Sequence, residues 1–274
     1  MKHHIGFSQS DLGADAPQSV ILSGEPERSH YIAQTYLENV KLLSQYRGLN
    51  SYLGKLPNGK PILVATSGMG APSLSIVVNE LVQVGIKCFI RVGTCGSIQP
   101  FILVGDIVIS QASLCRQGAA LDIAPPEYPA VADPFLTVAL VKTAAKLNIP
   151  YHLGITASVD SFYEGQERVE SSANPHLQSW LRGITAQYRQ LNILNYEMEV
   201  GTLFKMAGVY GFRAACVCAV VAQRTADESI VIEDKDAAVK RAIEVAIKTI
   251  SQDKNLVYER DNPSISVRVD SFLT

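Results

Sequence analysis

Short apolar runs alternate along this chain with longer segments in which apolar residues recur every three or four positions. The short runs predict β-strands and the longer segments predict helices. The predicted strands are Ser19–Leu22, Pro61–Thr66, Cys88–Val92, Asp106–Ser110, His152–Ala157, Ile193–Tyr196 and Ala214–Val221. The predicted helices are Pro72–Val84, Pro134–Leu147, Met198–Val209 and Ala237–Ile250.

Two neighbouring segments indicate the architecture. Within residues 72–84, Ile76, Val77 and Leu81 recur with helical period and can cover one face of a sheet. Residues 88–92 are apolar on both faces, which is typical of a central strand packed between helices. The alternation of strands and helices therefore predicts a three-layer α/β/α fold.

The domain organisation is simple. No linker and no internal repeat divides the chain, so we expect one domain over residues 1–274. From about residue 253 the sequence becomes more polar, and residues 253–274 are expected to form a C-terminal extension. The sequence does not indicate a role for this extension.

The composition excludes several classes of protein. The formal net charge is only −2, which argues against nucleic-acid binding. The 47% of hydrophobic residues excludes a disordered chain, and the 18% of charged residues suggests that further surface is buried in an oligomer.

The cysteines and the N-terminal sequence indicate in which cellular compartment the protein is expected. The five scattered cysteines include no CxxC pair, so we interpret them as buried free thiols and expect no metal site. The chain has no apolar leader segment and no run near the roughly 20 residues that span a bilayer. These features predict a cytoplasmic protein without membrane contact.

Candidate binding residues follow several strands, at the edge where open α/β sheets bind ligands. After the first strand, Gly24 permits close backbone approach and Arg28 offers a forked cation. A plain turn that begins a helix is the alternative. The glycine-rich turn over residues 67–73 leads into a helix, whose N-terminus attracts anions.

Arg91 is the strongest of these signals, because it stands in an otherwise apolar strand. A buried guanidinium is costly unless an anion or a carboxylate meets it, so either an anion site or a buried ion pair is expected. Together with Arg28 and Arg47, Arg91 favours a tetrahedral oxyanion such as phosphate. Thr94, in the turn predicted over residues 93–96, adds a hydroxyl donor.

Two further segments suit a nucleoside. Phe162, Gln166 and Arg168 combine an aromatic face, an amide and a guanidinium, which can stack on and hydrogen-bond a planar heterocycle. A solvated charged loop is the alternative. Glu197 and Glu199 stand where a strand passes into a helix, and one of them could grip a sugar diol. The alternative is that they only complement the helix dipole.

Taken in order, these motifs resemble the nucleoside phosphorylase family with a hexameric or trimeric α/β core. The motifs that carry the resemblance are Gly24-x-Pro26-x-Arg28, Gly68-x-Gly70-x-Pro72-Ser73 and Arg91-Val92-Gly93-Thr94-x-Gly96. Three more segments narrow it to the uridine phosphorylases: Phe162-Tyr163-x-Gly165-Gln166-Glu167-Arg168, Asn195-Tyr196-Glu197-Met198-Glu199 and residues 125–133. The resemblance covers about residues 4–250.

The resemblance implies a central mixed β-sheet flanked by helices and a pentosyltransferase activity. In uridine phosphorylases, inorganic phosphate attacks C1′ of uridine and gives uracil and ribose 1-phosphate, a step of pyrimidine nucleoside salvage. Phosphate is then a co-substrate, and neither a cofactor nor a metal is implied. Deoxyuridine and thymidine remain alternative substrates, and the physiological direction is open.

Residue roles also follow from the resemblance. Arg168, Gln166, Arg91 and Glu199 would carry the catalysis. Phosphate would be held by Gly24, Arg28, Arg47, Arg91 and Thr94, ribose by His4, Thr94, Met198 and Glu199, and the base by Phe162, Gln166, Arg168 and Arg224. His4 and Arg47 would reach a neighbouring subunit, which implies a hexamer built of dimers with shared sites. Residues 226–234 would form a lid.

The chain departs from the family pattern at two informative positions. Glu25 replaces the usual Asp of the first motif, and Gly48 replaces a Glu that holds an interface cation in one relative. The second change argues against a monovalent cation site, although Ser73 remains. Alternative functions are a purine nucleoside phosphorylase or a nucleosidase of the same fold, or a nucleoside-binding relative without catalysis.

Overall fold

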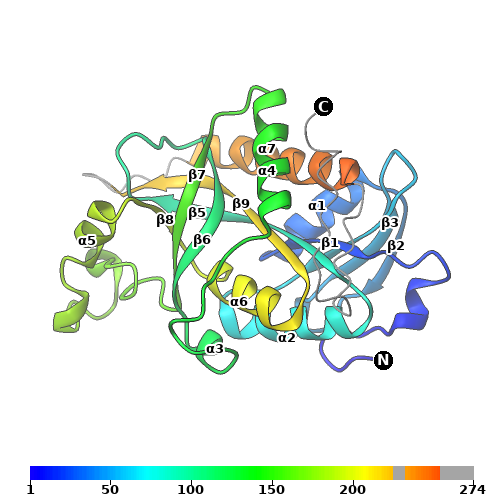
Figure 1. The fold of residues 1–274 in the computed structure, drawn as a ribbon, viewed down its shortest axis with the longest axis horizontal. Coiled ribbons are helices and arrows are strands. Elements are labelled where there is room, and N and C mark those ends of the chain that lie inside the picture. The colour runs from blue at the N-terminus through cyan, green and yellow to red at the C-terminus, as the bar shows by residue number, and fades with distance from the viewer. Residues whose placement is uncertain (225–231, 254–274) are drawn as a thin grey trace, which may run out of the picture.

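A computed structural model of the chain describes residues 1–224 and 232–253, and within them one mixed sheet forms the centre of the molecule (Figure 1). The strands of this sheet are β1 Ser19–Ser23, β2 Glu38–Ser44, β3 Ser51–Lys55, β4 Pro61–Thr66, β5 Cys88–Ser97, β6 Ile107–Arg116, β7 Tyr151–Val159, β8 Ile193–Glu197 and β9 Arg213–Gln223. Their spatial order is β2-β3-β4-β1-β5-β8-β7-β6-β9. Because β9 also pairs with β5, the last five strands of this order close into a barrel.

Helices cover both faces of the sheet. The apolar sides of α2 and α6 pack on one face, and those of α1, α4 and α7 pack on the other. The helices are α1 Pro26–Tyr36, α2 Ala71–Gln83, α3 Gly118–Leu121, α4 Pro134–Lys146, α5 Ile184–Gln190, α6 Val200–Tyr210 and α7 Ile232–Gln252, with short 3-10 turns η1 Gln9–Leu12, η2 Tyr46–Gly48, η3 Val169–Ser171 and η4 Ser179–Leu181. The predicted α/β/α layers with a mixed sheet are therefore confirmed.

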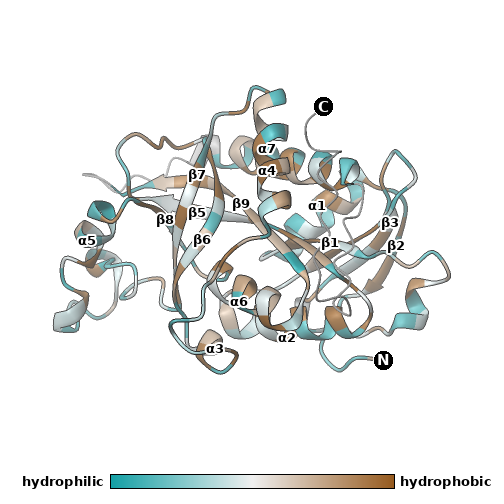
Figure 2. Cartoon of the chain, in the orientation of Figure 1, coloured by the Kyte–Doolittle hydropathy of each residue, from teal (hydrophilic) through white to brown (hydrophobic). Residues whose placement is uncertain are grey.

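Hydrophobic residues concentrate in the central strands, whereas the loops and the outer helix faces are more hydrophilic (Figure 2). The buried thiols belong to this interior: all five cysteines are free and four of them are buried. Cys216 and Cys218 share one face of β9, with their sulfur atoms 3.6 Å apart. The interpretation of the cysteines as buried free thiols is thus confirmed.

Strand β5 corrects one expectation, because residues 93–96 form no turn. They continue the strand to Ser97, with an irregularity between Cys95 and Gly96 where β5 pairs with β9. Pairing with β9 on one side and with β8 at its end keeps this glycine-containing stretch extended. The motif from Arg91 to Gly96 consequently runs along the middle of the sheet.

Two strands were not predicted from the sequence. β2 and β3 form an antiparallel extension at the edge of the sheet, beyond β4. Most side chains of β2 are exposed, so its sequence lacks the apolar run that marks the central strands. A polar edge strand such as β2 carries a weak signal because only one neighbouring strand pairs with it. β3 pairs with both β2 and β4 and is largely buried, but it spans only five residues.

Some expectations fall outside the described residues. Most of the predicted lid lies in residues 225–231, and α7 begins at Ile232. The proposed C-terminal extension, apart from its first residue, and the single-domain interpretation stay predictions. Among the helices of the described residues, none combines the length and apolar character needed to cross a membrane.

Candidate active site

Three segments from different parts of the chain meet at the predicted phosphate site. They are the turn after β1, the turn before α2 and the middle of β5. A Cβ atom placed on Gly24 would lie 3.6 Å from the carbonyl oxygen of Gly68 and 4.0 Å from Nη2 of Arg91. Glycine at position 24 therefore lets the β1 turn approach the guanidinium of Arg91 closely.

Two buried guanidiniums stand at this meeting point. Arg28 and Arg91 are 6% and 4% exposed, and the Nε atom of each is buried without a hydrogen-bond partner. Burial lowers the pKa of Arg28, Glu25 opposes that effect and the positive charge of Arg91 adds to it. Buried N–H groups without partners are costly, so these orphaned donors are groups that a bound anion would satisfy.

Arg91 also forms the ion pair that the sequence left open as an alternative. Its Nη2 donates a short hydrogen bond to Oε2 of Glu199. Burial is the largest effect and lowers the pKa of Arg91, but Glu199, Cys218 and Glu197 together outweigh it, and the net pKa lies above its usual range. A Cβ on Gly93 would collide with Nη1 of Arg91 at 1.9 Å, so glycine at position 93 makes room for this arrangement.

Glu199 links this anion site to the start of α2. Its Oε1 accepts a hydrogen bond of 2.7 Å from the backbone N–H of Gly70, the N-cap residue of α2. The anion that the sequence predicts at this helix N-terminus is thus the carboxylate of Glu199. One side chain therefore bridges the glycine-rich turn and Arg91.

Glu197 has a different role from Glu199, to which alone the resemblance assigned the ribose hydroxyls. Its Oε2 accepts hydrogen bonds from the backbone N–H groups of Glu199 and Val200, at 2.8 and 2.9 Å, and so caps α6. Its Oε1 accepts from the hydroxyl of Ser158. The helix-capping alternative holds for Glu197, which fixes the backbone that presents Glu199.

Glu197 makes the stability of the protein pH-dependent in a testable way. Burial raises its pKa to about 8, with Arg91 acting in the opposite direction. Because this pKa exceeds the unfolded value of 4.5, the folded state binds the proton more tightly. Its contribution to the free energy of unfolding therefore falls as pH rises from about 4.5 towards about 8.

The neutral variant Glu197→Gln should weaken this pH dependence. Urea unfolding of both proteins at pH 5.5 and pH 8.5 measures the difference, and the variant should lose less stability between the two pH values. An identical loss in both proteins would contradict the assignment.

Three of the four predicted base-binding residues lie together in the segment after β7. Gln166 and Arg168 are buried, which rules out the solvated-loop alternative for these two side chains. Nε of Arg168 lies 3.3 Å from Oε1 of Gln166, and its guanidinium carbon lies 4.3 Å from the centre of the Phe162 ring. The amide, the guanidinium and the aromatic face thus form one cluster, with Phe162 half-exposed at its edge.

Arg224 holds this cluster against the end of β5. Its Nη1 donates to the carbonyl oxygen of Gln166 and its Nη2 to that of Glu167, the latter at 3.4 Å. A Cβ on Gly96 would lie 3.3 Å from Cδ of Arg224 and 3.5 Å from Nη2 of Arg168. Gly96 therefore gives both arginines access to the strand that carries Arg91.

The separation of Arg91 and Gly96 along β5 suits a ligand made of three chemical groups. Arg91 and Gly96 are five residues apart, which corresponds to roughly 17 Å of extended chain. Thr94 lies between them, half-buried, and its side chain has no hydrogen bond to another described residue. The anion site, Glu199 and the base cluster are consequently distributed along one strand.

Gln117 supports the site and gave no signal in the sequence. Its Nε2 donates to the carbonyl oxygen of Met198 at 2.5 Å, and its Oε1 accepts from the backbone and hydroxyl of Thr202 at 2.8 and 2.9 Å. Met198 is half-buried beside Glu199. Gln117 therefore holds the turn between β8 and α6 in place, through hydrogen bonds to Met198 in the turn and to Thr202 in α6.

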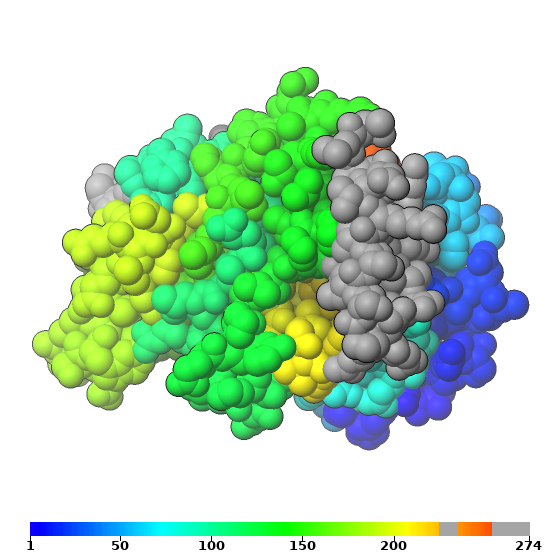
Figure 3. All heavy atoms as spheres, in the orientation of Figure 1, coloured from blue at the N-terminus to red at the C-terminus, as the bar shows by residue number. Residues whose placement is uncertain are grey.

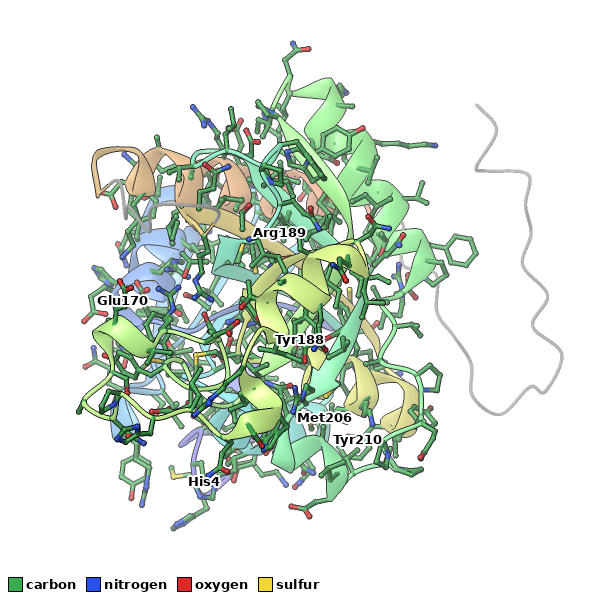
Figure 4. All side chains as sticks on the ribbon, turned by 90° about the vertical axis from the view of Figure 1, so that its left-hand side faces the viewer. His4, Glu170, Tyr188, Arg189, Met206 and Tyr210 are labelled. Carbon is green, nitrogen blue, oxygen red and sulfur yellow. The ribbon has the colours of Figure 1, made fainter. Side chains whose placement is uncertain are left out.

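His4 does not join the other site residues of its own chain. Its Nδ1 lies 2.8 Å from Oε1 of Glu80, ten residues along α2 from the Gly70 that contacts Glu199. This separation is about 15 Å along the helix. In Figure 4, His4 lies at an edge of the molecule, away from Tyr188 and Arg189 of α5.

Arg47 is also peripheral. It lies exposed in η2, between β2 and β3, and its guanidinium packs over the ring of Tyr46 at 5.6 Å. The N-terminal segment and residues 160–190 occupy opposite ends of the long axis (Figure 3). Exposed apolar side chains accompany both peripheral residues: Tyr46 beside Arg47, and Ile76 in a groove of about 440 Å³ that His4 lines.

Metal ligands do not gather in the part of the chain that the structure describes: no group of three or more histidine, cysteine or acidic side chains there could hold an ion. The geometry instead combines an anion site, an acidic group beside it and a cluster suited to a planar ring.

Comparison with known proteins agrees with this geometry. A sequence model of the Phosphorylase superfamily matches residues 18–252. The chain is 40% identical over 238 residues to the uridine phosphorylase of Thermococcus kodakarensis, covering 87% of this chain and 83% of that protein. It is 38% identical over 245 residues to the Escherichia coli uridine phosphorylase, covering 89% and 95%.

A relative of lower identity is a purine nucleoside phosphorylase. The DeoD-type purine nucleoside phosphorylase of Bacillus velezensis is 31% identical over 253 residues, covering 92% of this chain and all of that protein. The chain therefore belongs to the phosphorylase superfamily, as its motifs indicate.

Proposed function

We propose that this protein is a uridine phosphorylase, a pentosyltransferase that converts uridine and inorganic phosphate to uracil and ribose 1-phosphate. The observation that carries the proposal is the linear order of groups along β5. Two buried guanidiniums with orphaned donors stand at one end, and the Gln166–Arg168 pair stands at the other. Glu199 lies beside the first group and is free to exchange its ion pair for sugar hydroxyls.

The chemistry of the reaction fits these groups. Cleavage of the glycosidic bond develops positive charge on the ribose and negative charge on the departing uracil. Phosphate held by Arg28 and Arg91 stabilises the first charge and forms the new bond to C1′. Arg168 and Gln166 donate to the uracil anion, and donors positioned before the reaction often supply the largest catalytic contribution.

Glu199 connects substrate binding to the phosphate site. It pairs with Arg91 in the structure, and with uridine bound its carboxylate would accept hydrogen bonds from the ribose hydroxyls. Arg91 is then available to phosphate while both substrates are held in line, which lowers the entropic cost of their encounter.

We further propose that the active site is shared between subunits. His4 and Arg47 lie on the periphery of their own chain, where exposed apolar side chains accompany them. Such a surface suits burial against a second copy of the chain. A hexamer built of dimers is the assembly that we expect, and the free thiols support a cytoplasmic location.

The proposal predicts a phosphate-dependent activity with pyrimidine selectivity. Cleavage of uridine is followed by absorbance with and without phosphate, beside inosine and thymidine. We expect release of uracil only with phosphate and no cleavage of inosine. Cleavage of inosine would favour a purine phosphorylase, cleavage without phosphate a nucleosidase, and binding without cleavage a non-catalytic relative.

A further inference from the structure

The carboxylate of Glu25 occupies part of the anion site. Its Oε1 accepts a hydrogen bond of 2.8 Å from Nη2 of Arg28. The side chain of Glu25 is 51% exposed, whereas that of Arg28 is 5% exposed. An exposed acidic group thus reaches inward to a buried cation.

Because its carboxylate contacts Arg28, Glu25 does not cap the helix at whose N-terminus it stands. It is the N-cap residue of α1, yet its side chain accepts no capping hydrogen bond. The shorter Asp and Asn are favoured N-caps because their side chains reach the N–H groups of the first turn. The extra methylene of Glu25 instead carries its carboxylate to Arg28, three residues ahead.

The ion pair with Glu25 uses only one of the three guanidinium nitrogen atoms of Arg28. Nη1 donates to the carbonyl oxygen of Val92 at 3.3 Å, and Nε has no partner. Arg91 is close enough for its charge to lower the pKa of Arg28. Glu25 therefore supplies the counter-charge of Arg28, whereas the carboxylate of Glu199 pairs with the neighbouring Arg91.

Phosphate and Glu25 compete for the same cation. A phosphate dianion bound by Arg28 would take donors that Glu25 now holds, and it would be repelled by that carboxylate. We propose that Glu25 sets the affinity for phosphate: its carboxylate rests on Arg28 until phosphate displaces it. This inference rests on the proposed phosphate site.

The test removes the charge, or shortens the side chain, at this position alone. In Glu25→Gln the KM for phosphate should fall about threefold to fivefold, the upper part of the range for a partly exposed ion pair. The KM for uridine should stay within twofold. Glu25→Asp keeps the charge but is too short to hold Arg28 in the same way, so its KM for phosphate should fall as well.

Glu27→Gln is the matched control. Glu27 is exposed in the first turn of α1 and pairs with no described residue, so its loss changes the net charge equally. Its KM for phosphate should stay within twofold of the unmodified protein. An unchanged or higher KM for phosphate in both Glu25 variants would overturn the inference.

Calorimetric titration of the full chain with inorganic phosphate, without nucleoside, separates this inference from the proposed function. Tighter binding by Glu25→Gln with no cleavage of uridine would support the inference and overturn the function. Cleavage of uridine with equal phosphate affinity would do the reverse. Absence of phosphate binding in every variant would overturn both.

Discussion

Replacing Arg168 by alanine is expected to lower kcat/KM for uridine by about 10²- to 10³-fold, the cost of losing one donor aimed at developing charge. Arg168 is buried, contacts Gln166 and packs on Phe162. Its guanidinium would stabilise the uracil anion as the glycosidic bond breaks. Most of the loss should therefore fall on kcat, which steady-state kinetics with saturating phosphate measures directly.

A nearby arginine provides the control for this prediction. Arg182 is exposed in the same segment, and Arg182→Ala should keep kcat/KM for uridine within twofold. The circular dichroism and unfolding midpoint of both variants show whether the segment has kept its structure. Near-normal activity of a folded Arg168→Ala protein would contradict its part in stabilising the base.

Two inactive variants are expected to restore activity when their chains are co-expressed. Arg47→Ala removes a group that we propose to serve the partner's site, and Glu199→Gln removes a group of the chain's own site. Each variant alone should lose about 100-fold in kcat/KM, the scale of a charged hydrogen bond. In a mixed dimer, one of the two sites keeps both residues.

The fraction of normal activity that should be restored follows from how the chains pair. Random pairing makes half of the dimers mixed, so about a quarter of all sites should be intact. Differently tagged chains allow the mixed species to be purified, and its activity per site should approach one half of normal.

The control co-expresses Glu199→Gln with Arg168→Ala. Both of these residues serve their own chain's site, so no mixed dimer contains an intact one and activity should stay low. Equal activities of the two mixtures would contradict a site shared through Arg47.

The central part of the fold could be predicted because its strands are buried on both faces. β1, β4 and β5 read as apolar runs. The bounds of β1 and β4 follow from the sequence within one residue, and so does the start of β5, although β5 continues five residues beyond its predicted end. The pairing of β5 with β9, which closes the barrel, joins residues more than 100 positions apart. No local pattern encodes such a contact, and the expected turn at residues 93–96 was wrong for that reason.

Site residues could be predicted where a charged side chain stands in an otherwise apolar segment of the sequence. Arg91 stands out as a cation in an apolar strand, and the structure gives it both an ion pair and an orphaned donor. The residues around Glu197 and Glu199 left open which of them binds a ligand. The family resemblance selected Glu199, and the structure shows why: Glu197 caps α6, while Glu199 pairs closely with Arg91. Gln117 gave no signal, because its function depends on two distant backbone groups.

The fate of phosphate tests the proposed reaction most directly. Phosphorus NMR of a mixture of protein, uridine and inorganic phosphate follows both the phosphate and any sugar phosphate. We predict a ribose 1-phosphate signal that grows in step with the release of uracil, measured by absorbance on the same sample. Release of uracil with the phosphate signal unchanged would mean that water is the acceptor, and would contradict the part assigned to Arg28 and Arg91.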